Sequence, residues 1–199
     1  MTFLKQLKAD EEIFKKDYTK QEGLVITVSG LASSGKSVGA KALAQHFKLE
    51  YISAGDIVRQ LAKERNISLH EICHNVTKDV DLEIDKRTIK YAIKGKVVLD
   101  GRLTGWVAWE HAKVRIIYIT PFDVRAKRFA ERENVNIEEA RNFVENRDDK
   151  DIQRYKNHYG IDIQDSSIYH IKIDNSDWKL EDAKIKPIEL VEEFLKKNN

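Results

Sequence analysis

The clearest chemical pattern in the chain is the run GLASSGKS at residues 30–37, which satisfies the spacing G-x-x-x-x-G-K-[ST]. Its two glycines permit a tight turn whose backbone N–H groups approach phosphate oxygens, while Lys36 reaches the outer phosphates. The Ser37 hydroxyl is a ligand of the kind that holds Mg²⁺. About one chain in a hundred of this length would match by chance. We therefore predict that a nucleoside triphosphate contacts Gly30, Leu31, Ala32, Ser33, Ser34, Gly35, Lys36, Ser37 and Val38.

A second polar group lies in the segment ISAGDIVR at residues 52–59. We expect Asp56 to cap a helix and Arg59 to lie one turn into it, which would bring a hydroxyl and a cation close to the predicted phosphate loop. The alternative is a plain helix cap followed by a surface arginine.

The segment VVLDGR at residues 97–102 ends a predicted strand with an acid and a cation. Ligands of open parallel sheets bind outside the carboxyl ends of the strands. There, Asp100 offers an acid close to Mg²⁺ or its water, and Arg102 offers a cation for a second phosphate. A buried acid that caps a helix is the alternative.

Arginine is concentrated in the second half of the chain. All 11 arginines fall within residues 59–154, and eight of them within residues 102–154. A guanidinium group matches phosphate with two parallel hydrogen bonds, so we predict that arginines neutralise phosphoryl oxygens; a solvated salt-bridge ladder is the alternative. Two predicted helix faces carry these side chains, at Arg125, Arg128 and Arg132, and at Arg147, Asp151 and Arg154.

Composition excludes several classes of protein. Lys and Arg number 35 and Asp and Glu 33, a net charge of +2 that does not suit a dedicated nucleic-acid binder. No run approaches 18 apolar residues, which excludes a membrane-spanning helix. Residues 1–23 alternate lysine with acids and lack the apolar region of a signal peptide, and the single cysteine, Cys73, fits a reducing compartment. We expect a cytoplasmic monomer that binds small polyanions.

Apolar runs predict the strands that position these groups. They fall at residues 24–29, 51–52, 97–100, 114–119 and 169–173. Helical patterns lie between them, at residues 36–47, 56–65, 68–71, 82–94, 121–133, 138–159 and 187–197. Because strands and helices alternate and the strands lack polar alternation, we predict a three-layer α/β domain with a parallel sheet over residues 23–199. Residues 1–22 stand outside it as a predicted N-terminal helix.

Taken in order, these phrases resemble the cytidylate kinases of the nucleoside monophosphate kinase family, most closely the short archaeal type. The resemblance covers about residues 23–196. It rests on ISAGDIVR at 52–59, LDGRLTGW at 99–106, VRAKRFAERE at 124–133 and RYKNHYGIDIQDSSIY at 154–169. Bacterial members carry a segment similar to ENRDDKDIQR at 145–154.

The resemblance implies a P-loop kinase fold with a five-stranded parallel sheet, a monophosphate-binding lobe at residues 53–93 and a lid at 126–148. The implied reaction is transfer of the γ-phosphate of ATP to CMP or dCMP, with Mg²⁺ held by Ser37. The implied catalytic residues are Lys36, Arg102, Arg128, Arg147 and Arg154, and ATP would also meet Arg128 and Arg132. The acceptor nucleotide would meet Ser53, Asp56, Arg59, Asp100, Arg102, Arg147, Asp151 and Arg154.

Two positions depart from the bacterial members. Leu103 stands where they have an acid after the DGR arginine, although GRL fits the archaeal type. Residues 66–86 contain no counterpart of their base-reading arginine, with Arg87 just beyond, so this departure concerns the choice of base. Two other functions therefore stay open. One is a P-loop kinase for AMP, UMP or a non-nucleotide acceptor, and the other is a nucleotide-dependent ATPase in RNA or ribosome assembly.

Overall fold

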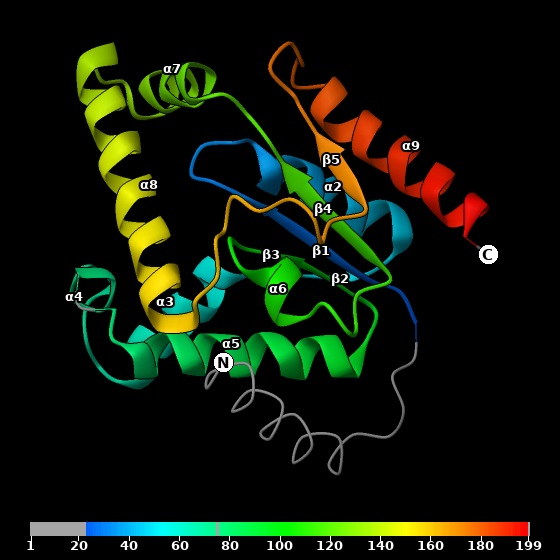
Figure 1. Ribbon diagram of the computed structural model, residues 1–199, viewed down its shortest axis with the longest axis horizontal. Helices are drawn as coiled ribbons and strands as arrows, with labels where there is room; N and C mark the ends of the chain where they lie inside the picture. The colour runs from blue at the N-terminus through cyan, green and yellow to red at the C-terminus, as the bar shows by residue number, and fades with distance from the viewer. Residues whose placement is uncertain (1–22, 75, 199) are drawn as a thin grey trace.

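A computed structural model describes residues 23–74 and 76–198 (Figure 1). Its sheet confirms the predicted five parallel strands, in the order β2-β3-β1-β4-β5. The strands are β1 (Val25–Gly30), β2 (Glu50–Ser53), β3 (Val97–Asp100), β4 (Val114–Tyr118) and β5 (Ile171–Ile173). The predicted N-terminal helix at residues 1–22 lies outside the described residues.

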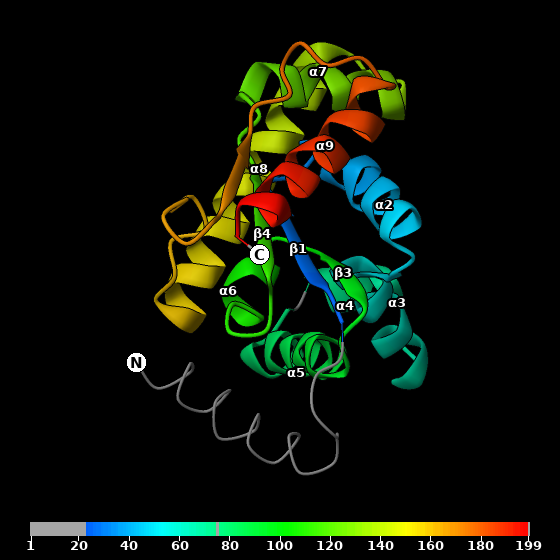
Figure 2. The ribbon, with the colours of Figure 1, turned by 90° about the vertical axis from the view of Figure 1, so that its right-hand side faces the viewer.

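Helices cover both faces of the sheet, which confirms the three-layer architecture (Figure 2). One face packs against α2 (Lys36–Phe47) and α9 (Asp182–Lys197), the other against α5 (Lys78–Lys94) and α6 (Thr104–Val107). Side chains alternate along a strand. Ile26 and Val28 therefore join the core beneath α2, while Val25 joins the core on the opposite face.

Two groups of helices extend beyond the sheet on the side of its carboxyl ends. The helices α3 (Ala54–Glu64), α4 (Leu69–His74) and α5 enclose an apolar cluster that contains Leu61 and Ile72. The second group is the antiparallel pair α7 (Phe122–Glu133) and α8 (Ile137–Tyr159). With 23 residues and a length of about 35 Å, α8 runs from α7 down to α5 (Figure 1). It can therefore supply side chains along the whole space between the two groups.

Three predicted boundaries are wrong. The last helix begins at Asp182, so that Pro187 lies inside it, buried where the ring packs beside Gly39. Helix α5 begins four residues earlier than predicted, at Lys78, because the Thr77 hydroxyl accepts from the Val80 N–H at 3.4 Å. Strand β5 has only three residues, beginning at Ile171. In the two helices, packing or a cap outweighs the local pattern.

Among residues 23–74 and 76–198, no helix has the length and apolar character needed to cross a membrane.

Candidate active site

The phosphate loop has the strand–loop–helix form that its sequence predicts. It leaves β1, which is buried along its whole length, and α2 begins at Lys36. Gly35 has a φ of 81°, a left-handed conformation that costs glycine little. Ser33, at φ 59°, adopts a similar conformation with a side chain attached. The N–H groups at the start of α2 therefore point toward the space above the loop, where an anion is stabilised.

The back of the loop is held by a cluster around the Ser34 carbonyl. This oxygen accepts from the Asn175 amide at 2.9 Å and from Arg128 Nη1 at 3.3 Å. The Thr120 hydroxyl, which donates to Asn175 Oδ1 at 2.7 Å, lies 3.1 Å from the same carbonyl. The guanidinium of Arg128 also donates to the Asn175 carbonyl at 2.6 Å. These hydrogen bonds hold the phosphate loop in place through its Ser34 carbonyl.

Arg128 lies behind the loop in this structure, and its predicted role at the transferring phosphoryl group stays a prediction. Its donors are used on carbonyl oxygens and the Asn175 side chain, and it lines neither of the two cavities described below. Arg125, one turn earlier, is buried against Asp148 at 2.6 Å and donates to the Ala32 carbonyl at 3.2 Å. Of the three arginines on this helix face, only Arg132 reaches a cavity.

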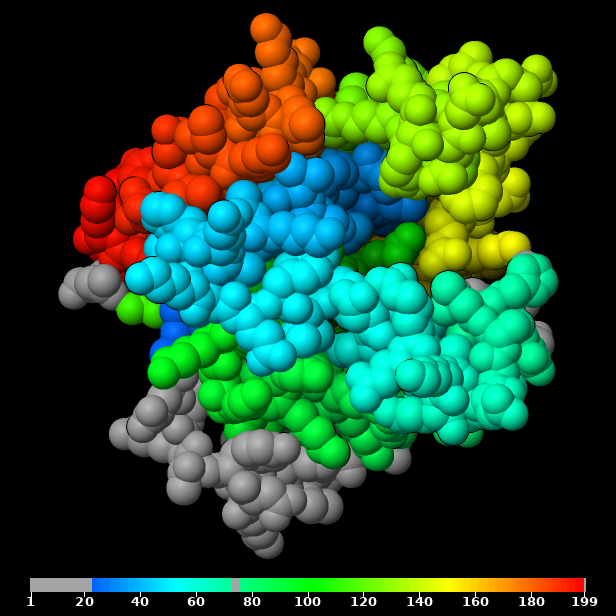
Figure 3. All heavy atoms as spheres, turned by 180° about the vertical axis from the view of Figure 1, so that it is seen from behind, coloured from blue at the N-terminus to red at the C-terminus, as the bar shows by residue number. Residues whose placement is uncertain are grey.

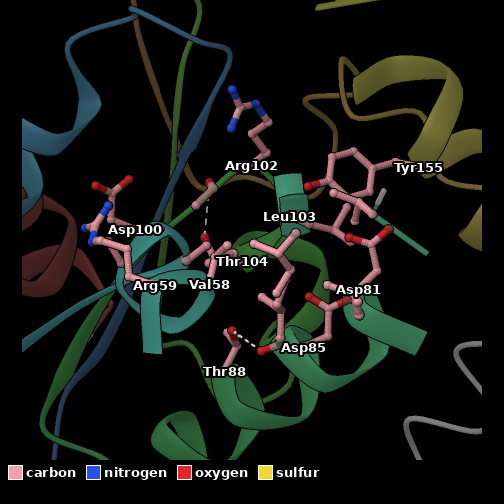
Figure 4. Close-up of a pocket in the computed structure, with 18 of the residues that line it drawn as sticks. Val58, Arg59, Asp81, Asp85, Thr88, Asp100, Arg102, Leu103, Thr104 and Tyr155 are labelled. Carbon is pink, nitrogen blue, oxygen red and sulfur yellow. Dashed lines mark hydrogen bonds between the residues drawn. The ribbon is translucent and has the colours of Figure 1, made fainter. Parts of the chain in front are cut away.

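An acceptor cavity of about 340 Å³ lies between β3, α3, α5 and α8 (Figure 4). Its wall combines charged groups near the phosphate loop with apolar groups farther away. The predicted site residues that line it are Lys36, Ser37, Ser53, Arg59, Asp100, Arg102, Arg147 and Arg154.

Asp56 does not line this cavity, and it is not the helix cap. Ser53 is the N-cap of α3: its hydroxyl accepts from the Asp56 N–H at 3.0 Å. The Asp56 carboxylate accepts from the same hydroxyl and from Arg59, which keeps its pKa below the usual range. Asp56 thus orients Arg59, which does line the cavity.

A donor cavity of about 410 Å³ lies on the other side of Lys36. Ala32 and Ser33 form its wall on the loop side, and α7 and α8 form the opposite wall. Phe129 and Phe143 stack there with ring centroids 4.3 Å apart, and the Arg132 guanidinium lies 5.3 Å from the Phe129 ring. From behind, the molecule is hollowed between the α7–α8 pair and α3 (Figure 3).

The two cavities meet at three cations. Lys36, Arg102 and Arg147 line both of them, so an anion that extends from one cavity to the other passes this cluster. Burial lowers the pKa of the Lys36 ammonium, and the nearby carboxylate of Asp100 opposes that shift.

The sequence model of the cytidylate kinase-like family matches residues 25–177. The chain belongs to this family. The protein named cytidylate kinase from Pyrococcus horikoshii is 43% identical over 163 residues, which cover 81% of this chain and 84% of the relative. Its namesake from Staphylothermus marinus is 39% identical over 176 residues, covering 87% of this chain and 97% of the relative. The resemblance seen in the sequence is confirmed.

Solved structures confirm the P-loop kinase fold. An uncharacterized protein from Eubacterium ventriosum has a TM-score of 0.65 and 20% identity, covering 85% of this chain and 98% of the other. The shikimate kinase from Bacteroides thetaiotaomicron has a TM-score of 0.58 and 13% identity, with the same coverage. At such identities the likeness concerns the fold alone.

In this cytidylate kinase-like chain, the predicted Arg147–Asp151–Arg154 face has an unexpected arrangement. Asp151 is 2% exposed and lines neither cavity. Its carboxylate is paired with Arg102, with Arg147 at 3.4 Å and with Arg154 at 3.1 Å. The Asp151 oxygens thus hold three guanidinium groups that line the acceptor cavity. The predicted contact of Asp151 with the acceptor nucleotide stays a prediction.

Asp100 lies at the carboxyl end of β3, opposite Val28 of the phosphate-loop strand. Its Oδ2 accepts from the Tyr51 hydroxyl at 2.8 Å, whereas the buried Oδ1 has no hydrogen-bond partner among residues 23–74 and 76–198. Ser37 lines the same cavity. A carboxylate oxygen and a hydroxyl are ligands that suit Mg²⁺, so the residues present fit the metal that this fold implies.

Sequence reasoning did not single out five residues near the site, which are Tyr51, Asp81, Asp85, Tyr155 and Asn175. Tyr155 lies within the segment 154–169 that carries the resemblance. The spacing of Asp81 and Asp85 places both on one helix face and was a further signal. Arg87, the nearest candidate for a base-reading arginine, is engaged with Glu64 at 2.6 Å and Glu83 at 2.9 Å and does not line the acceptor cavity.

Proposed function

We propose that this protein transfers the γ-phosphate of ATP to CMP or dCMP, giving ADP and CDP or dCDP. One observation carries the proposal: the donor and acceptor cavities share Lys36, Arg102 and Arg147. Membership of the cytidylate kinase-like family supports the choice of substrates.

Phosphoryl transfer requires positioning and positive charge more than covalent work by the protein. The phosphate loop and Lys36 hold the outer phosphates of ATP, with Arg132 and the stacked phenylalanines on the donor side. Arg59 binds the acceptor phosphate, and Arg102 and Arg147 neutralise the group in transit. No general base is needed, because the acceptor phosphate is itself an anionic nucleophile near neutral pH.

Ser37 and the Oδ1 atom of Asp100 would hold Mg²⁺. When bound, the ion supplies charge neutralisation at the phosphates of ATP. Tyr51 fixes the other carboxylate oxygen and thereby sets the direction in which Oδ1 points.

The two helix groups also provide a means of excluding water. The reaction must be shielded, because water would otherwise compete with CMP for the phosphoryl group. We propose that α7–α8 and α3–α5 approach each other over the bound substrates, with Asp151 of α8 holding Arg147 of the same helix beside Arg102 of the turn after β3.

A coupled assay of ADP release over a panel of acceptors tests the proposal. CMP and dCMP should accelerate ATP turnover strongly, UMP weakly, and AMP and GMP little, whereas RNA should have no effect. Stimulation by RNA or a protein partner without any response to CMP would instead support an assembly ATPase. A strong response to AMP or to a non-nucleotide alcohol would identify a different acceptor.

A further inference from the structure

The acceptor cavity has a polar pair at the end farthest from its phosphate-binding cations. Asp81 and Asp85 lie one turn apart on α5, are 4% and 7% exposed, and both line the cavity. Figure 4 shows them on the side opposite Arg59 and Asp100. Lining residues from α3 and α4 are apolar here, with Val58 and Ile72 among them. A ligand that reaches this end meets two carboxyl groups within an apolar wall.

The two carboxyl groups differ in their ion-pair and hydrogen-bond partners. Asp81 Oδ2 lies 2.8 Å from His158 Nδ1 and 3.6 Å from Arg154 Nε, so its negative charge has two partners. Asp85 has no ion pair of its own, and its buried Oδ2 has no hydrogen-bond partner within residues 23–74 and 76–198. Besides Asp81 on its own helix, the groups that face it are Arg154 and Tyr159 of α8.

Burial and the neighbouring charge of Asp81 raise the pKa of Asp85 to about 8, although the Tyr159 hydroxyl and Arg154 act in the opposite direction. Near neutral pH, Asp85 is therefore a neutral acid with one O–H donor and one carbonyl acceptor. Because its Oδ2 atom has no hydrogen-bond partner among the described residues, this buried carboxyl gains most from a ligand that offers both an acceptor and a donor.

We infer that Asp81 and Asp85 form the base-recognition element of the acceptor cavity, with Asp85 donating to cytosine N3 and accepting from the 4-amino group. The Asp81 carboxylate accepts the second hydrogen of that amino group. This inference rests on the proposed function and deepens it.

The pair discriminates between pyrimidines through Asp81. Uracil carries an oxygen, O4, in place of the 4-amino group. This oxygen and the Asp81 carboxylate are both acceptors, and they would then face each other without a hydrogen between them. A site built to bind an N–H group rejects an analogue that lacks it, because buried polar groups are left unpaired.

Equilibrium binding of CMP and UMP to the full chain, measured by calorimetry, tests the inference. The variants are Asp85→Leu, Asp85→Asn and Asp81→Asn, with Asp79→Asn as the matched control. Asp79 lies on the same helix but is exposed and lines neither cavity. Circular dichroism and ATP affinity establish that each variant is folded and that its donor site is intact.

We expect Asp85→Leu to weaken CMP binding about 10- to 100-fold with unchanged ATP affinity. Asp85→Asn, whose amide keeps one donor and one acceptor, should bind CMP about tenfold more tightly than the leucine variant. Between pH 7 and pH 9 the wild-type affinity for CMP should fall as Asp85 ionises, and that of Asp85→Asn should stay constant. Asp81→Asn should reduce the preference for CMP over UMP about tenfold.

Equal CMP affinity in wild type, Asp85→Leu and Asp79→Asn would overturn the inference, as would an unchanged CMP to UMP ratio in Asp81→Asn. The proposed function would survive either result, because CMP would still bind and be phosphorylated. Failure of the wild-type chain to bind CMP at all would instead refute the proposed function.

Discussion

The guanidinium of Arg102 is paired with the buried carboxylate of Asp151, so the turn after β3 is tied to the middle of helix α8. Arg102 follows the strand next to β1, whereas Asp151 belongs to the helix pair beyond the sheet. The pair thereby joins the rigid sheet to a helix group that lines both cavities. A buried charge that loses its partner is costly, so this end of the acceptor site depends on the docking of α8.

Replacement of Lys36 by alanine should lower kcat about a hundredfold or more, since Lys36 lies where the two cavities meet and acts on charge that develops during transfer. The far-ultraviolet circular dichroism spectrum should not change. Lys63→Ala, at an exposed position of α3, is the control and should keep wild-type turnover. Equal turnover in wild type and Lys36→Ala would contradict the kinase assignment.

Substitution of Arg59 and substitution of Arg132 should each raise the KM of a different substrate. Arg59 lines only the acceptor cavity and Arg132 only the donor cavity. Loss of a charge-assisted hydrogen bond to phosphate should raise KM about tenfold. Arg59→Gln should therefore raise KM for CMP, and Arg132→Gln should raise KM for ATP. Steady-state kinetics with each substrate varied in turn measures both values; the reverse pattern would mean that the cavities have been assigned to the wrong substrates.

Arg154→Ala should reduce CMP turnover severely and also lower stability, by about 3 kcal/mol at pH 7. The guanidinium lies 3.1 Å from Asp151 and 3.6 Å from Asp81, both buried. Without it, the folded-state pKa of Asp81 rises further above its unfolded value. The loss of stability is then present above that raised pKa and disappears as the pH falls through it. Urea unfolding at pH 7 and pH 5 measures this; equal stability of variant and wild type at pH 7 would show that Arg154 is dispensable for packing.

Asp85 should reduce the stability of the ligand-free protein as the pH rises. Its folded-state pKa of about 8 exceeds the unfolded value of about 4, so the folded state binds more protons between these values. Stability attributable to Asp85 is full below pH 4, falls from pH 4 to pH 8, and is constant above pH 8. Asp85→Asn should therefore be more stable than wild type at pH 8 by a few kcal/mol, with a smaller difference at pH 5. Urea unfolding of both proteins at the two pH values checks the sign, and a constant difference would contradict it.

Asn175→Ala should weaken ATP binding without a change in CMP binding. The Asn175 side chain is buried and donates to the Ser34 carbonyl at 2.9 Å, while its oxygen accepts from Thr120 and Arg128. Its removal leaves these groups short of a partner, at a cost of about 1–3 kcal/mol in stability. ATP and CMP titrations together with thermal unfolding test this. The exposed Asn142→Ala is the control, and an equal effect on both nucleotides would mean that the cluster supports the whole domain.

The parts of this protein that are encoded in short contiguous segments could be predicted from the sequence alone. The phosphate loop is set by the spacing of Gly30, Gly35 and Lys36, because a turn and the start of a helix are local structures. Apolar runs likewise predicted the five strands, since strands buried on both faces cannot tolerate polar alternation. The order of motifs along the chain was enough to indicate the family, without knowledge of any contact.

The contacts of each charged side chain could not be predicted in this way, because they depend on how distant segments pack together. Arg128 and Arg132 share one predicted helix face, yet one holds the Ser34 carbonyl and the other lines a cavity. Asp151 was expected to face the ligand and instead lies behind three arginines. Helical spacing gives the direction of a side chain around its own axis. What that side chain meets depends on the elements packed against the helix, and for α8 these come from distant parts of the chain.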